Sequence, residues 1–271
     1  EVADQEMPAV AMTDHGNMHG AFEFYNAANA AGVKPIIGLE AYVTPGSGSR
    51  TDKTPVRWSD GGEDDVSGNG AYTHMTLLAK NTEGMYNLFR MSTMAYTDGI
   101  FYKPRIDREL LHKYGKGLIG TTGCAAGEIN VLLRFGRWDD AVATVREMQE
   151  IFGKENYYCE IMRHGIEIEE RTEKELIRLA RETGMPLLAS NDLHYVHDHQ
   201  AESQEALLCV QTNDTLDNPD RFRFGGSGFY LKSPEQMREL FKDLPEACDN
   251  TLKIADECNV DFSKQELMPK F

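Results

Sequence analysis

The chain has 271 residues, of which 41% are hydrophobic, and it carries a formal net charge of −16 at pH 7. This length allows a large core, and no stretch approaches the roughly 18 to 20 apolar residues of a membrane span, which excludes a helical membrane protein. Because phosphate neutralisation needs clustered Lys and Arg, the negative charge excludes binding to nucleic acid or anionic membranes through charge alone.

The N-terminal segment and the cysteines indicate a cytoplasmic protein. Residues 1–10, EVADQEMPAV, lack the basic and then apolar layout of a signal peptide. The five cysteines form no CxxC pair, and their odd number argues against a disulfide framework. We therefore expect free thiols, a cytoplasmic location and no contact with membranes.

Short apolar runs alternate with helical segments along the first 200 residues. The apolar runs predict strands at residues 7–12, 34–43, 72–79, 117–122, 157–162 and 185–190. Helices are predicted between them, at residues 17–31, 82–94, 127–135, 138–152 and 168–183. This alternation predicts parallel strands with helical crossovers, and therefore an α/β barrel or a doubly wound sheet.

Three segments depart from the alternation. Residues 44–70 are rich in Gly, Ser, Asp and Thr and have no apolar period, which predicts a long surface loop or insertion. Residues 96–114 are expected to be less regular than their neighbours. The last part is predicted to be mostly helical with a Gly-rich turn at residues 224–230, so we divide the chain into a barrel of residues 1–200 and a helical part of residues 201–271.

Side chains of metal-binding types recur at equivalent points of the alternation. In parallel α/β folds the carboxyl ends of the strands converge on one mouth, where active sites lie. A set of His, Glu, Cys and Asp side chains suits zinc or manganese, and two ions that share a carboxylate can generate hydroxide and stabilise a phosphoryl displacement. The residues in or directly after the predicted strands are Asp14, His15, Glu40, His74, Cys124, Asp192 and His194.

Several of these residues also have a purely structural alternative. Asp14 could cap the following helix, His74 could be a hydrogen-bonded core histidine, and Cys124 could be a small buried hydrophobe. Glu40 is harder to explain in this way, because an ionised carboxylate in an apolar strand is costly unless it is paired or bound to a metal. The repeated position at the strand ends favours the metal-binding interpretation.

Several motifs resemble those of one family. The segments TDHGNMHGAFEFY, KPIIGLEAY, YTHMTLLAKN, GLIGTTGCAAGE and SNDLHYV, with EALLCVQT and FGGSGFYLKS, resemble the PHP (polymerase and histidinol phosphatase) domain of the bacterial DNA polymerase III alpha subunit. The resemblance runs over residues 1–271 and implies a distorted barrel of about seven βα units with one to three divalent metal ions, zinc or manganese, at its mouth. It implies that Asp14 orients its neighbour, and that the metal ligands are His15, Glu40, His74, Cys124, Asp192 and His194.

The chain also departs from the family pattern. The family opens with a strand that carries a His-x-His motif and, a few residues later, an acidic ligand, and this sequence begins after that point. We therefore expect a barrel without its first strand, with unpaired strand edges and one metal site complete around Glu40, His74 and Cys124, the other two being damaged. Because ELMPKF, residues 266–271, resembles the point where the family continues into its polymerase domains, we expect a fragment of a replicative polymerase.

Three functions remain open. The first is metal-dependent 3′→5′ exonuclease proofreading at a DNA 3′ end, with His194, His15 or His164 as the proton-transfer group. The second is a structural module that supports the remaining polymerase domains and docks other replisome subunits. The third is hydrolysis of a small phosphoester, as in the histidinol phosphatase relatives, although the polymerase-type segment at residues 221–240 counts against it.

Overall fold

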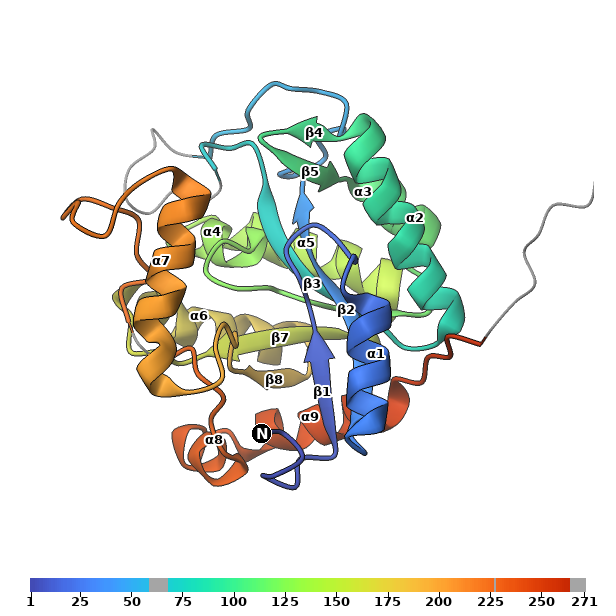
Figure 1. The fold of residues 1–271 in the computed structure, drawn as a ribbon. Helices are drawn as coiled ribbons and strands as arrows, with labels where there is room; N and C mark the ends of the chain where they lie inside the picture. The colour runs from blue at the N-terminus through green and yellow to red at the C-terminus, as the bar shows by residue number, and fades with distance from the viewer. Residues whose placement is uncertain (59–67, 227, 264–271) are drawn as a thin grey trace, which may run out of the picture.

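The computed structural model describes residues 1–58, 68–226 and 228–263, which form a curled sheet with helices packed around it (Figure 1). The sheet has eight strands in the order β4-β5-β2-β3-β6-β7-β8, and β1 pairs with β2. The strands are β1 (Ala9–Met12), β2 (Lys34–Val43), β3 (Thr73–Ala79), β4 (Ile100–Phe101), β5 (Lys103–Ile106), β6 (Leu118–Thr121), β7 (Tyr157–Met162) and β8 (Leu187–Ser190).

The helices of the described residues confirm the α/β class and the helical C-terminal part. They are α1 (Ala21–Ala30), α2 (Thr82–Asp98), α3 (Arg108–Tyr114), α4 (Glu128–Arg134), α5 (Trp138–Phe152), α6 (Glu167–Thr183), α7 (Ala201–Thr212), α8 (Pro234–Leu240) and α9 (Pro245–Glu257). None of them is both long enough and apolar enough to cross a bilayer. All five cysteines are free thiols, as expected.

The core lies between the sheet and its helices. Strand β2 is buried at every residue after Lys34, which is why its sequence is an almost continuous apolar run. Helix α2 packs on the sheet through Met85, Leu88 and Met91, whose spacing of three residues places them on one helix face. This packing fixes β2 and β3, the two strands from which the candidate site is built.

The expectation of parallel strands throughout is wrong for β3. Strand β3 runs antiparallel to both of its neighbours, β2 and β6, whereas β6, β7 and β8 are parallel to one another. The described part of the segment between β2 and β3 contains no crossover helix, and a return without a crossover makes an antiparallel pair. As a result, the first residues of β3 lie beside the last residues of β2.

The stretch at residues 96–114 is more regular than expected. It contains the end of α2, the β4–β5 hairpin and α3, which begins after Asp107, whose side chain accepts a hydrogen bond from the Leu110 amide. The fully buried Arg105 guanidinium donates to four backbone carbonyls, those of Gly99, Ala71, Arg50 and Asp52. It thereby ties the described start of the insertion to the hairpin.

The sheet is open along two edges of the described residues. No ladder joins β8 to β1 there, which agrees with the expected unpaired edges. Residues 44–58 and 68–70 form no helix or strand, as predicted, and the rest of the predicted 44–70 loop lies outside the described residues. Helix α9 packs against β8, and the division of the chain at residue 200 stays a prediction.

Candidate metal centre

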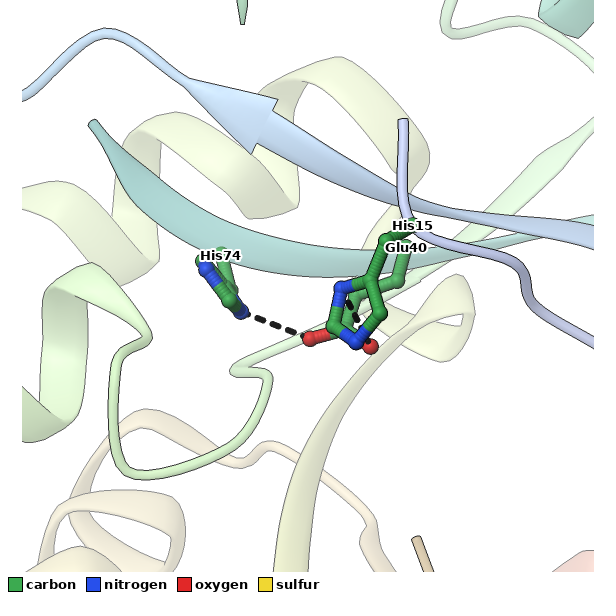
Figure 2. A group of neighbouring side chains, drawn as sticks. All are labelled: His15, Glu40 and His74. Atoms are coloured by element: carbon green, nitrogen blue, oxygen red, sulfur yellow. Dashed lines mark hydrogen bonds and ion pairs between the residues drawn. The ribbon is translucent and has the colours of Figure 1, made fainter. Parts of the chain in front are cut away.

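The side chains of His15, Glu40 and His74, from distant parts of the chain, point toward one another beside the second half of β2 (Figure 2). The Nδ1 atom of His74 lies 2.7 Å from Oε1 of Glu40, and Nδ1 of His15 lies 3.4 Å from Oε2 of the same carboxylate. One potential ligand atom from each of the three side chains lies within 4.8 Å of the others. Glu40 is therefore the centre of the group, with one imidazole on each carboxylate oxygen.

Strand register brings Glu40 and His74 together. In the antiparallel β2–β3 pair, Glu40 stands opposite Thr76 and Tyr42 stands opposite His74. Side chains on opposite residues and on residues two positions away share one face of the sheet, so Glu40 and His74 form a diagonal pair. His74 lies at the start of its strand, not the end, because β3 is reversed.

His15 reaches the same place through the backbone. The segment after β1 continues along β2, where the Glu40 amide donates to the Asp14 carbonyl and the Gly16 amide donates to the Glu40 carbonyl. Gly16 has a φ of +68°, and a Cβ there would lie 2.8 Å from the Tyr42 ring. Only glycine fits this turn without strain, and the turn fixes the position of His15.

Cys124 lies in the loop after β6 and faces the same group. Its Sγ atom is 3.5 Å from Nδ1 of His74 and 3.7 Å from Oε1 of Glu40. Its carbonyl accepts a hydrogen bond from the Asn130 side chain, while the His74 amide donates to the Ala126 carbonyl. These bonds hold the loop against the start of β3, so the thiol position is defined.

Asp192 and His194 complete the mouth from the loop after β8. The rings of His194 and His15 lie 6.2 Å apart, and Asp192 has a left-handed backbone with a φ of +44°, a conformation that Asp tolerates better than most residues. Nδ1 of His194 lies 2.7 Å from the Asp192 carbonyl oxygen. A carbonyl only accepts, so Nδ1 donates and the lone pair is on Nε2, the arrangement typical of metal-binding histidines.

The electrostatics of the group call for a cation. Burial raises the pKa of Glu40, but the hydrogen bond and charge of His74 and the charge of His15 outweigh it and hold that pKa below its ordinary value. Burial and the charge of Glu40 raise the pKa of Asp192, and the same two causes raise the pKa of the Cys124 thiol well above its usual range. Partial burial lowers the pKa of His15. The two carboxylates and the thiol disfavour one another's ionisation, and a bound cation would remove this penalty.

The donor set fits a divalent metal ion. No Lys or Arg pairs with Glu40 or Asp192 in the part of the chain that the structure describes; their ion-pair partners there are histidines. Imidazole nitrogens, carboxylate oxygens and a thiol are the ligands that zinc and related ions take in proteins. His15, Glu40 and His74 could hold such an ion, with Cys124, Asp192 and His194 within reach of the same mouth.

Two further predicted residues occupy different positions. Asp14 is exposed beside Gly20, and it does not cap α1, which begins only at Ala21 and has no side-chain cap. His164 is buried, with Nδ1 2.7 Å from Glu169 and Nε2 2.9 Å from the Asn191 carbonyl oxygen. Because both ring nitrogens are already bonded, His164 has no free nitrogen to offer a substrate, which argues against the predicted proton-transfer role.

Sequence reasoning missed three groups beside the site. Tyr42 stacks on His15 with the ring centroids 6.0 Å apart, and Phe229 stacks on His164 at 4.1 Å. Glu160 is buried in β7, and burial raises its pKa while the Thr121 hydroxyl donates to it. The acidic residue inside the apolar run YYCEIM was the available signal for Glu160. Nothing comparable marks Phe229, whose position depends on the course of the Gly-rich segment.

The curled α/β sheet and its group of His, Glu, Asp and Cys side chains are the features of a class of α/β proteins whose site could hold a metal ion. Residues 1–164 match the model of the PHP domain, and the chain belongs to this family.

Curated relatives agree with this assignment. The DNA polymerase III subunit alpha of Saccharopolyspora erythraea is 49% identical over 98% of this chain and 23% of its own length. That of Mycobacterium leprae is 49% identical over 94% of this chain and 22% of its own, and that of Thermus aquaticus is 44% identical over 95% and 20%. The chain thus spans about a fifth of the length of the curated relatives it matches. The resemblance seen in the sequence is confirmed.

Proposed function

We propose that this chain is the PHP-domain part of a replicative DNA polymerase III alpha subunit, and that its site removes nucleotides from DNA 3′ ends. The observation that carries the proposal is the meeting of His15, Glu40 and His74, whose ligand atoms lie within 4.8 Å of one another. The names of the relatives support a role in DNA replication. Such a role would place the chain in the cytoplasm, where bacterial DNA is replicated.

The residues at the mouth would bind a divalent ion, zinc or manganese. Glu40 would be the central carboxylate, His15 and His74 would add nitrogen ligands, and Cys124 would add sulfur. Asp192 and His194 would close the opposite side. A bound divalent ion supplies Lewis acidity and a low-pKa water, the two requirements of phosphodiester hydrolysis at neutral pH.

Hydrolysis of the terminal phosphodiester forms one new P–O bond, breaks the bond from phosphorus to the 3′ oxygen, and moves a proton to that oxygen. His15 could pass this proton only when it is not bound to the ion, because a metal-bound imidazole has no lone pair left to accept one; unbound, its lowered pKa leaves it neutral at pH 7. Its side chain is 45% exposed, so solvent and substrate reach it. His194, with its lone pair on Nε2, is the second group that could do so.

The direct test is loss of 3′-terminal nucleotides from a 5′-labelled single strand, with Mn²⁺ or Zn²⁺ added and without nucleoside triphosphates. We expect hydrolysis by the full chain and none by His74→Ala. The matched control is His112→Ala, which removes an exposed histidine of α3 whose ion-pair partner within the described ranges is Glu147. Equal activity in His74→Ala and the control, or no hydrolysis of any phosphodiester by a folded, metal-loaded chain, would contradict the proposal.

A second function, docking within a larger polymerase, has its own support in α7. Leu207 and Val210 of this helix are 64% and 81% exposed, and they lie three residues apart on one face. A folded chain that binds metal but hydrolyses neither DNA nor a small phosphomonoester would favour this function. Hydrolysis of the phosphomonoester alone would favour the histidinol phosphatase type.

A further inference from the structure

The β4–β5 hairpin lies at the end of the sheet toward which β2 runs (Figure 1). Strand β5 is parallel to β2, with Tyr42 opposite Arg105, so the register places Lys103 at the level of Glu40. The turn after His15 abuts the same hairpin, because a Cβ on Gly16 would lie 3.0 Å from Pro104. The hairpin tip is therefore part of the rim around the site.

Lys103 brings a positive charge to this rim. Its Nζ atom lies 5.5 Å from the centre of the Tyr42 ring, which meets the His74 ring at 5.1 Å. No described carboxylate lies within ion-pair distance of Lys103, although the whole chain carries a charge of −16. An unneutralised lysine beside a candidate phosphodiester site is suited to a phosphate contact.

Tyr102 occupies the tip of the hairpin in an unusual conformation. It is the single residue between the paired Phe101 and Lys103, has a φ of +61°, and is 78% exposed. A left-handed backbone is disfavoured for a bulky side chain, and such residues gather at functional sites. The core does not require this ring, since it is mostly exposed and its ring neighbour among the described residues is Phe101, with the centroids 4.7 Å apart.

The rest of the hairpin is rigid enough to present that ring. The Arg105 guanidinium lies 4.9 Å over the Phe101 ring and is fixed by its bonds to backbone carbonyls, among them those of Gly99 and Ala71. The exposed aromatic ring offers base stacking, and the neighbouring lysine, which has no carboxylate partner among the described residues, offers attraction to phosphate; proteins combine these two contacts to hold single-stranded nucleic acid without reading its sequence.

We propose that Tyr102 and Lys103 form a binding site for the strand that enters the metal centre. Tyr102 stacks on a base near the 3′ end, and Lys103 contacts a backbone phosphate. This inference rests on the proposed function, because it names how the substrate of that site is held. It also predicts a preference for single strands, since paired bases are not free to stack on the ring.

Strand binding is measured by fluorescence anisotropy of a labelled oligothymidylate with EDTA present, so that binding is tested apart from hydrolysis. Tyr102→Ala should weaken binding about 5- to 150-fold, the range for loss of one stacked base, and Tyr102→Trp should restore it. Lys103→Ala should make the plot of log K against log salt concentration shallower by about 0.7, the value for one phosphate contact on a single strand. In hydrolysis assays both variants should raise KM more than they lower kcat.

Matched controls are available in the neighbouring helices α2 and α3. Tyr86→Ala removes an aromatic ring that is 39% exposed near the start of α2, and Lys113→Ala removes a lysine that lies 5.2 Å over the Tyr114 ring. Neither should change binding. A 3′-terminal 5-iodouracil should photo-crosslink to Tyr102.

Wild-type binding and salt slope in Tyr102→Ala and Lys103→Ala, with no crosslink, would overturn the inference and leave the proposed function standing if hydrolysis persists. Failure of hydrolysis in the unmodified chain would instead count against the proposed function, while the binding data would still decide on the hairpin.

Discussion

The Cys124 thiol is expected to lose its proton when a divalent ion binds. Its sulfur lies 3.5 Å from Nδ1 of His74 and 3.7 Å from the Glu40 carboxylate. Burial, together with the charges of Glu40 and Asp192, holds the pKa of this thiol well above its usual value, so the free chain carries the protonated thiol between pH 7.0 and 8.5. Metal coordination requires the thiolate, and each bound ion therefore releases that proton.

One released proton makes the metal association constant rise tenfold for each pH unit, about 1.4 kcal/mol. Between pH 7.0 and 8.5 the affinity for Zn²⁺ should rise about 30-fold. Glu40 and His15 add nothing to this slope, because both have pKa values held below their ordinary ones and are already deprotonated. Competition with a chromogenic chelator at several pH values measures the slope.

The control is a second buried cysteine away from the site. Cys258, at the end of α9, has a pKa raised to about 12 by burial, and Cys258→Ala should leave the slope unchanged. Cys124→Ala should flatten it. A native slope near zero, or the same slope in Cys124→Ala, would refute the assignment of this thiol as a ligand.

Three more substitutions test the geometry. Arg105→Lys removes the guanidinium that donates hydrogen bonds to four backbone carbonyls, and should lower the free energy of unfolding in urea by about 2 to 4 kcal/mol. A loss under about 0.5 kcal/mol would contradict a structural role for these hydrogen bonds. Burial lowers the pKa of His164, but the hydrogen bond and charge of Glu169 outweigh burial, so the pKa is raised in the folded chain. Protonated His164 therefore stabilises the fold fully below pH 6.5, and this stabilisation is lost as the pH rises through the folded-state pKa. The stability difference between the native chain and His164→Gln should thus narrow from pH 6 to pH 9, and a constant difference would contradict the assignment. Gly16→Ala, which drives a Cβ to 2.8 Å from the Tyr42 ring, should weaken Zn²⁺ binding at least tenfold by moving His15, and unchanged affinity would count against that turn.

Much of the fold could be predicted from the sequence because its strands are nearly continuous apolar runs. The range 34–43 was predicted as a strand and is β2 residue for residue, and 157–162 is likewise β7. The direction of β3 could not be predicted, since an apolar run reads the same in either direction. Its reversal depends on the long insertion before it, in which the described residues form no crossover helix.

The candidate site was predictable in its residue types but not in its pairings. Glu40 could be singled out because a carboxylate in an apolar strand needs a partner, and the structure provides two histidines. The sequence could not show that both ring nitrogens of His164 are hydrogen-bonded, because their partners, Glu169 and Asn191, come from different parts of the fold. The β4–β5 hairpin was also missed, because its strands have two and four residues, too few to show an apolar period.

The most direct test of the metal centre is anomalous diffraction from crystals of the full chain grown with Zn²⁺ or Mn²⁺. If these residues bind the metal, an anomalous peak should lie within about 2.0 to 2.3 Å of the Glu40 carboxylate and the His74 imidazole, the range of zinc–ligand bonds. Crystals that hold the metal only at other places, with Glu40 and His74 bonded to each other alone, would contradict their assignment as ligands.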